Sequence, residues 1–313
     1  MDLAILKVLA VIVCVISTVV NCAVVVTVFQ ARKQRAINIL IANWSLLTCF
    51  TSLFSLFALG NGERLVQNVW TCPIISFLRN WMVNMYPLHV LAIIYEACSQ
   101  LKPRFGNLLI LRTICLSWIL PGVGSMYSLL GTTFSARISV PIFGNVGLGI
   151  ILEILRALFF HLGSPACMTY LLYKSRGKLK YLKTLKVSVS KNPITLEKLK
   201  RVRFILSYSM FFIIFWVPFG LLFTFYRIFE AFRKSSASGE QNQDLKKSTS
   251  DSLSLITIGL YTGIACFYIY IVFSPVIVLW TGDGRLRQQF VNLLRRGACE
   301  VDNNRYWCPL DMW

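Results

Sequence analysis

Residues 198–226 read KLKRVRFILSYSMFFIIFWVPFGLLFTFY, and this stretch decides the fold because it joins a basic start, a long apolar body and a proline. Residues 204–226 carry no charge and reach the roughly 20 residues that a helix needs to cross a bilayer core. Pro218 removes a backbone hydrogen bond and crowds the preceding turn, so we expect a kink there. Phe212 and Trp216 lie one turn apart on the same face. The stretch is either a moving part with two packings or an ordinary proline-kinked membrane helix.

The composition indicates a membrane protein that crosses the bilayer several times. Of the 313 residues, 56% are hydrophobic and only 14% are charged, and the hydrophobic residues fall in blocks. The net charge of +19 would fit a nucleic-acid partner, but the basic residues sit in short runs between the apolar blocks. We therefore interpret the charge as a topology signal and expect no nucleic acid as a partner.

The apolar blocks predict an all-α membrane protein, a bundle of seven transmembrane helices with a short amphipathic cytoplasmic helix. The seven-helix domain, with the amphipathic helix, would cover residues 1–297, and residues 298–313 would form a short cytoplasmic tail. The amphipathic run covers residues 284–296, where Leu286, Phe290, Leu293 and Leu294 follow helical spacing between arginines. We expect the spans at residues 3–29, 37–59, 72–97, 114–130, 146–173, 204–226 and 253–280, with the fifth interrupted by Gly163 and Pro165.

The connections between the spans differ strongly in charge. Residues 174–203 carry eleven Lys or Arg and one acid, whereas residues 227–251 carry five basic residues and four acids, with a disordered-looking section at 235–250. The first, third and fifth connections together with the tail hold 22 of the 32 basic residues. The positive-inside rule then puts the N-terminus outside and the C-terminus in the cytoplasm of a multi-pass plasma-membrane protein. Residues 131–145 are expected to be a loop.

Several small signals occur in the order found in one receptor family. They are Asn21 in the first span, Trp118 in the fourth, Pro165 with Tyr173 in the fifth, Phe212, Trp216 and Pro218 in the sixth, and Ser274 with Pro275 in the seventh. Together with the amphipathic run, these residues make the chain similar to rhodopsin-like G-protein-coupled receptors over nearly its whole length.

The departures from that family are equally informative. Glu96-Ala97-Cys98 stands in place of the acidic-Arg-Tyr triplet, Thr48 in place of an aspartate, and Val278 in place of a tyrosine. Such losses, with the short N-terminus and the Phe273-Ser274-Pro275 sequence, resemble vomeronasal type 1 receptors and their fish olfactory relatives.

The resemblance implies a chemosensory receptor for an odorant-like or pheromone-like small ligand, which signals through a heterotrimeric G protein by movement of the sixth helix. The alternative within the class is an orphan receptor for another ligand, such as a peptide or a lipid. The residues implied as the activation switch are Phe212, Trp216, Pro218, Ser274, Pro275 and Tyr173. Those implied on the G-protein side are Glu96, Ala97, Lys198 and Arg201. Cys299, just after the amphipathic run, resembles a palmitoylation site, and a free thiol is the alternative.

Polar and aromatic residues inside the spans supply the expected ligand contacts, which are Arg79, Asn84, His161, Phe219 and Tyr268. An ionisable group at the depth of Arg79 is costly and usually functional, which favours an anionic or hydrogen-bond-accepting ligand. The alternative is an internal pair between Arg79 and Glu153, and Glu153 can also pair with Arg156 three residues on. His161, Phe219 and Tyr268 have packing roles as their alternative.

Other protein classes have weaker support. A transporter or channel predicts inverted repeats and paired broken helices, and the sequence contains no evident repeat. We expect no enzyme, because no aspartate occurs between Asp2 and Asp244 and no His-Glu-x-x-His run is present. No cofactor is implied. His89 and His161 lie on different spans without a carboxylate or cysteine cluster, so no metal site is expected.

Overall fold

The computed structural model describes residues 3–30, 36–66, 71–99, 107–126, 129, 132–135, 138–141, 146–185, 193–237, 243–281 and 287–293. These residues are almost entirely helical. The elements are α1 (Leu3–Gln30), α2 (Ala36–Val66), α3 (Thr71–Ser99), α4 (Asn107–Ser125), β1 (Thr132–Ser135), β2 (Ile138–Pro141), α6 (Val146–Arg156), η1 (Ala157–Gly163), α7 (Ser164–Leu185), α8 (Pro193–Ala237) and α9 (Gln243–Thr281).

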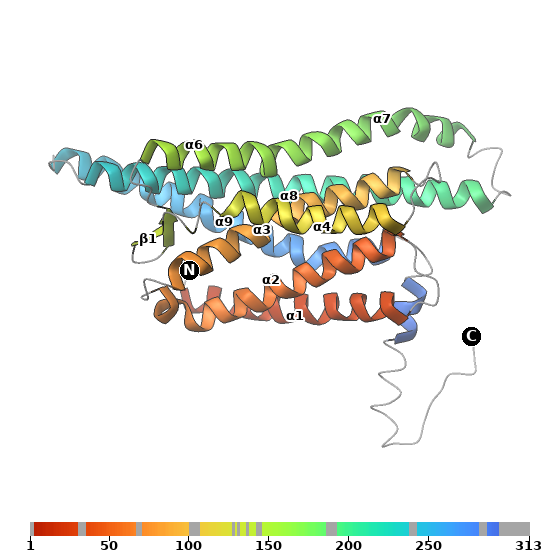
Figure 1. Ribbon diagram of the computed structural model, residues 1–313, viewed down its shortest axis with the longest axis horizontal. Helices are drawn as coiled ribbons and strands as arrows, with labels where there is room; N and C mark the ends of the chain where they lie inside the picture. Colours follow the sequence, from red (N-terminus) through yellow and green to blue (C-terminus); the bar gives the residue numbers. More distant parts are fainter. Residues whose placement is uncertain are drawn as a thin grey trace, which may run out of the picture.

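The helices lie side by side along the long axis of the molecule (Figure 1). α6, the π-helix η1 and α7 form one continuous rod, which packs along α8, and α8 packs along α9. α3 lies inside the bundle and contacts α2, α4, η1, α7 and α8. The antiparallel β1–β2 hairpin contacts α3 and α8 at the end of the bundle where α3 begins and α8 ends (Figure 1).

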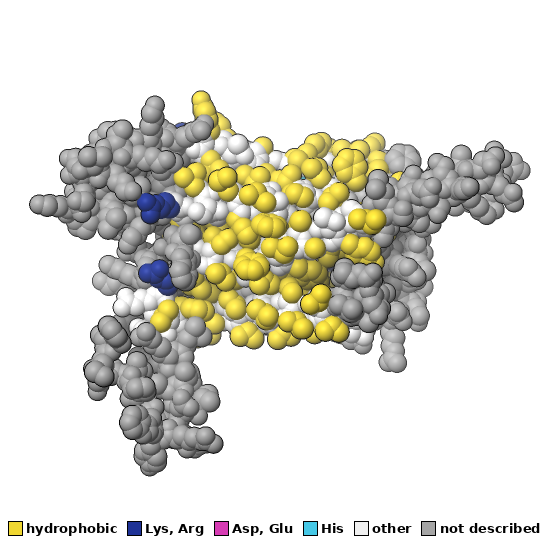
Figure 2. Space-filling model, turned by 180° about the vertical axis from the view of Figure 1, so that it is seen from behind, with side chains coloured by type: hydrophobic (Ala, Val, Ile, Leu, Met, Phe, Trp, Pro, Cys, Tyr) yellow, Lys and Arg dark blue, Asp and Glu magenta, His cyan; other side chains and the backbone are white. Residues whose placement is uncertain are grey.

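The outside of the bundle is apolar. Figure 2 shows a broad band of hydrophobic side chains with the visible Lys and Arg side chains at one margin of the band. Within the described ranges, five helical segments are long and apolar enough to cross a membrane: Lys7–Gln30, Ala36–Gly60, Ile150–Lys174, Arg203–Phe229 and Ile258–Leu279. Apolar helices with apolar outer faces indicate a membrane protein. α3 and α4 are not among the five, and α3 carries Arg79, Asn84 and His89 within its length.

The interior is built on aromatic rings. Trp216 of α8 is fully buried, and its ring contacts Tyr86 of α3 at 5.5 Å and Tyr270 of α9 at 6.2 Å between centroids. Tyr270 continues the cluster to Trp44 of α2 at 6.3 Å. Offset and edge-to-face aromatic pairs contribute about 0.5–1.5 kcal/mol each beyond the burial of their area. This aromatic core therefore joins α2, α3, α8 and α9.

A polar contact ties α1 to α2 and α9. Ser52 of α2 donates to the hydroxyl of Ser17 (3.0 Å), and Ser17 donates to the carbonyl oxygen of Ile271 on α9 (3.4 Å). Asn21 donates to the carbonyl oxygen of Ser17 one turn before it (2.8 Å). Buried polar groups inside a membrane helix need such partners, and these ones fix the position of α1.

Some element bounds differ from the sequence prediction. α4 begins at Asn107 and ends at Ser125, whereas the span was expected at residues 114–130. α8 continues to Ala237 and α9 begins at Gln243, so much of the section expected to be disordered, residues 235–250, is helical. Gln243, Leu245, Lys246 and Lys247 are good helix formers at the start of α9, so the helix begins before its apolar part. Within residues 131–145, expected to be a loop, the β1–β2 hairpin forms.

The predicted break in the fifth span is present as η1. Pro165 has no backbone N–H and crowds the turn before it, which favours a widened turn with i→i+5 bonding. Glycine suits position 163, because a Cβ atom there would lie 3.0 Å from the carbonyl oxygen of Leu158. α8 remains helical through Pro218.

The amphipathic run forms a helix over residues 287–293, in which Phe290 packs against the core. A groove between this helix and the end of α1 is lined by Thr27, Gln30, Gln289, Asn292 and Leu293.

Candidate functional site

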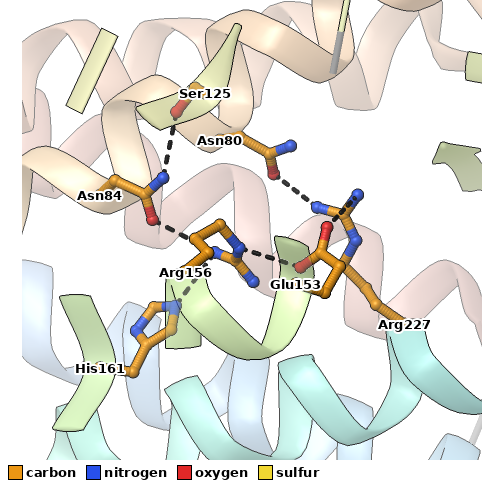
Figure 3. Close-up of polar contacts among 7 residues, drawn as sticks. All are labelled: Asn80, Asn84, Ser125, Glu153, Arg156, His161 and Arg227. Carbon is orange, nitrogen blue, oxygen red and sulfur yellow. Dashed lines mark hydrogen bonds and ion pairs between the residues drawn. The ribbon is translucent and has the colours of Figure 1, made fainter. Parts of the chain in front are cut away.

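A buried ion cluster lies between α6 and α8. The two oxygens of Glu153 bind different arginines: Oε2 accepts from Nε of Arg156 at 2.9 Å, and Oε1 pairs with Nη2 of Arg227 at 2.8 Å (Figure 3). All three side chains are buried, with relative exposures of 2–4%. Placing ions out of water costs several kcal/mol each unless they are paired and hydrogen-bonded, so this cluster is an expensive feature of the fold.

Amide side chains of α3 bind the other faces of the two arginines. Nη1 of Arg227 donates to Oδ1 of Asn80 at 2.9 Å, and Nη1 of Arg156 donates to Oδ1 of Asn84 at 3.2 Å (Figure 3). Asn84 in turn donates to the hydroxyl of Ser125 on α4 at 3.0 Å. Asn80 and Asn84 are one helical turn apart, so both face the cluster. The cluster therefore joins α3, α4, α6 and α8.

A third guanidinium group reaches the same place. The guanidinium carbons of Arg79, Arg156 and Arg227 lie 5.8, 5.7 and 5.8 Å from the centroid of the Phe223 ring. Arginine interacts favourably with an aromatic ring within about 6 Å of its centroid. Phe223 lies one turn before Arg227 on α8, so its ring forms an apolar wall of the cluster.

The π-helix η1 brings His161 to the cluster. Residues five apart lie on one face of a π-helix, and Nη1 of Arg156 is 3.1 Å from Nε2 of His161, five residues on. Because a guanidinium group only donates hydrogen bonds, Nε2 accepts and the ring proton of a neutral His161 lies on Nδ1. Gly220 of α8 makes room for the ring: a Cβ atom at Gly220 would lie 2.6 Å from Cγ and Nδ1 of His161.

His161 connects the ion cluster to the aromatic core. Its ring lies 5.7 Å from the Trp216 ring and 6.4 Å from the Phe219 ring. Trp216 stacks on Phe212 at 5.3 Å and meets Phe219 edge-on at the same distance. Phe219 stacks on Phe223 at 5.7 Å. α8 thus carries a continuous row of rings from the ion cluster to the level of Phe212.

Of the expected ligand contacts, the structure brings four together. Asn84 and His161 bind Arg156, Arg79 lies over Phe223, and Phe219 lies between Phe223 and Trp216. Tyr268 does not join them, since its hydroxyl lies among Cys14 and Ser55 on the α1–α2 side of α9. Glu153 pairs with Arg156 three residues on, which was one of the two pairings of Glu153 considered from the sequence.

The residues of the expected activation switch do not all lie inside the bundle. Phe212 and Trp216 are fully buried and stacked, and Ser274 is also fully buried. Pro218 and Pro275 lie inside α8 and α9. Tyr173 is 72% exposed on the outer face of α7, so it does not contact the others as the family pattern implied.

The residues expected at the G-protein side are less completely described. Glu96 and Ala97 are buried near the end of α3. Lys198 and Arg201 belong to α8, but their side chains lie outside the described part. Cys299 also lies outside the described residues.

No group of three or more His, Cys, Asp or Glu able to hold a metal occurs within the described ranges. His89 binds the Met85 carbonyl at 2.9 Å and Ser117 at 3.3 Å.

Sequence reasoning missed Arg227, Asn80 and Phe223. Arg227 was assigned to a connection because it follows the uncharged run. The spacing of the residues could have placed Arg227 in the helix, since Phe219, Phe223 and Arg227 repeat every four residues and share one helix face.

Comparison of the sequence with protein-family models and with curated proteins finds no match.

Proposed function

We propose that this chain is a seven-span receptor of the rhodopsin-like type, which binds a small ligand at the buried ion cluster and signals to a heterotrimeric G protein. In this proposal the rod formed by α6, η1 and α7 is the fifth span, α8 is the sixth and α9 is the seventh. α3 and α4 are also spans in this proposal, since Asn84 and His89 of α3 and Ser117 of α4 are buried inside the bundle. The chemosensory branch fits the departures at Glu96 and Ala97.

The observation that carries the proposal is the unbroken contact from the ion cluster to Trp216. Arg156 binds His161, and the His161 ring packs on Trp216, which lies two residues before Pro218. Trp216 in turn contacts α3 through Tyr86 and α9 through Phe267 and Tyr270. A rearrangement of the cluster therefore changes the packing of a side chain that holds α8 against both α3 and α9.

The mechanism follows from these contacts. A ligand that moves Arg156 also moves His161, and the Trp216 ring then loses one of its packing surfaces. α8 lacks the backbone hydrogen bond of Pro218 at this level, so its two halves can change their relative angle. Shifting such an equilibrium from 1:99 to 99:1 requires about 5.5 kcal/mol of differential binding.

Nucleotide exchange on purified G proteins tests this proposal. We expect the reconstituted chain to accelerate exchange on at least one G-protein class, either basally or with a compound from a small-molecule panel. Trp216→Leu should reduce the rate at least several-fold. Phe225→Leu is the matched control, because Phe225 lies on the same helix but is 66% exposed on its outer face. Absence of exchange on every G-protein class, with and without compounds, would reject the receptor function.

A further inference from the structure

We propose that Arg79, Arg156 and Arg227 form an oxyanion-binding site, in which a carboxylate or phosphate of the ligand takes the place now held by the Glu153 carboxylate. The inference rests on the proposed function, since it names the ligand class of that receptor. The expected ligand is a small amphipathic anion with its charged group on the arginines and its apolar part along Phe223 and Phe219.

The charges of the cluster favour an added anion. Three guanidinium groups lie around the Phe223 ring, and the Glu153 carboxylate bridges those of Arg156 and Arg227. Arginine offers five N–H donors and no acceptor, and its planar fork matches carboxylate and phosphate oxygens. Buried guanidinium donors within an apolar bundle are stabilised by an anion that binds several of them at once.

Two buried donors point to the same conclusion. Nε of Arg227 has no hydrogen-bond acceptor among the described residues, although this side chain is 2% exposed. Nδ1 of His161 also has none there, and it carries the ring proton when Nε2 accepts from Arg156. Buried donors normally have an acceptor, so two unsatisfied donors at one cluster indicate a place for a polar ligand.

The present position of Glu153 shows that the site fits a carboxylate. Its two oxygens lie 2.9 Å from Arg156 and 2.8 Å from Arg227, so one carboxylate bridges arginines from α6 and α8. An external oxyanion can make the same two contacts, while Arg79 lies on the same ring as both of them. Glu153 therefore acts as an internal competitor that the ligand displaces.

The neighbours of the site suit an amphipathic ligand. Phe223 and Phe219 stack at 5.7 Å and offer a continuous apolar surface next to the guanidinium groups. The β1–β2 hairpin contacts α3 and α8, the helices that carry Arg79 and Arg227. Because Nη1 of Arg156 contacts both Asn84 and His161, an anion drawn to Arg156 alters the contact that leads to Trp216.

Thermal unfolding in phosphatidylcholine nanodiscs tests the site directly. The probes are hexanoate and hexyl phosphate, with hexanol and hexylamine as neutral and cationic controls of the same chain length. We expect a saturable rise in Tm with the two anions and none with the controls. Arg227→Gln should abolish the rise, and Arg112→Gln should leave it unchanged, because Arg112 is an exposed arginine on α4.

Glu153→Gln keeps the test decisive if Arg227→Gln does not fold. Removing the internal competitor should lower the Kd for hexanoate about ten-fold. A second set of nanodiscs containing phosphatidylserine separates a free anion from a lipid headgroup. A rise in Tm produced by the lipid and lost in Arg227→Gln supports the same site with a headgroup as occupant. Equal effects of hexanoate and hexanol, or an unchanged Kd in Glu153→Gln, would overturn the inference.

The outcomes also separate this inference from the receptor function. A chain that drives nucleotide exchange but shows no anion-specific rise in Tm retains the proposed function and loses the oxyanion site. A chain that binds anions through Arg227 but activates no G protein retains the site and loses the receptor function.

Discussion

Gly220 and His161 fit against each other in a space that no larger residue at position 220 could share. A Cβ atom at Gly220 would lie 2.6–2.8 Å from three atoms of His161, which is closer than carbon and nitrogen atoms approach without a shift of one side chain. His161 cannot retreat freely, because Arg156 and Trp216 hold its other edges. The position of the imidazole ring therefore depends on the absence of a side chain on α8.

The first prediction concerns Gly220→Ala. The added methyl should lower the free energy of unfolding by about 1–3 kcal/mol, because overpacking in a tight interior forces neighbours out of place. Thermal unfolding in detergent measures the change. Gly60→Ala is the matched control, since nothing lies within 4 Å of a Cβ there and alanine favours the helix.

A double variant makes this prediction specific. If the clash is with His161, then His161→Ala should remove most of the penalty of Gly220→Ala, and the two changes should be strongly non-additive. Additive losses would contradict the contact.

At this scale the sequence predicted local relations better than distant ones. The pair Glu153–Arg156 was readable because residues three apart on a helix are neighbours. The second arginine on Glu153 was not readable, since residue 227 is 74 positions away and its approach depends on how α8 packs against α6. The side-chain amide of Asn21 donates to Ser17 on its own helix, and it is Ser17 that makes the contacts with α2 and α9.

α8 is the element on which the proposed signal depends. It is 45 residues long and remains helical through Pro218, where the backbone carbonyl of Ile214 has no N–H donor four residues on. Trp216 and Phe219 flank this position and make the contacts to α3, η1 and α9. The weakest backbone position of the helix thus coincides with its densest ring packing.

The second prediction concerns Pro218→Ala. Restoring the backbone donor should stiffen α8, raise Tm by roughly 2–4 °C for each kcal/mol gained, and reduce stimulated nucleotide exchange. Pro193→Ala is the control, because Pro193 is the first residue of α8, where a missing N–H costs nothing. An increase in both Tm and exchange would contradict a hinge at Pro218.

The apolar blocks predicted which parts of the chain form helices, but not the residues at which those helices begin and end. The predicted spans lie within or overlap the observed helices, because about 20 apolar residues in sequence leave few other structures. The ends of α8 and α9 were missed, since polar helix formers beyond the apolar core look like a connection. The interruption before Pro165 was predicted from Gly163 and Pro165, but its π-helical form depends on packing against α8.

Within the described helices, apolar side chains cover the outer face of the bundle, and many polar side chains are buried. Val19 in the middle of α1 is 62% exposed, whereas Ser17 and Asn21 beside it are fully buried. This distribution is the reverse of that of a water-soluble protein and matches a bilayer as the solvent.

The third prediction concerns Val19→Lys. A lysine at the centre of a lipid-facing helix should cost about 2.5–3.5 kcal/mol on insertion, so a smaller fraction of chains should integrate into microsomes. Val8→Lys is the matched control: Val8 is also exposed but lies near the end of α1, where a lysine can extend its ammonium to the interface. Equal integration of both variants would show that α1 does not face lipid.

The fourth prediction concerns orientation. Epitope tags inserted in residues 186–192 and 238–242, both outside the described residues, should behave oppositely. The positive-inside rule predicts that antibodies reach the tag at 238–242 on intact cells and the tag at 186–192 only after permeabilisation. The reverse pattern would invert the chain and exclude the receptor function.

The wide turn of η1 has a consequence for how such a protein can diverge. It accommodates about one residue more than an α-helical stretch covering the same length. A single in-frame codon deletion there would straighten the rod and turn Arg156 and His161 away from each other while leaving both residues in the gene. One mutational step would thus separate the ion cluster from the aromatic core, and its reversal would reconnect them.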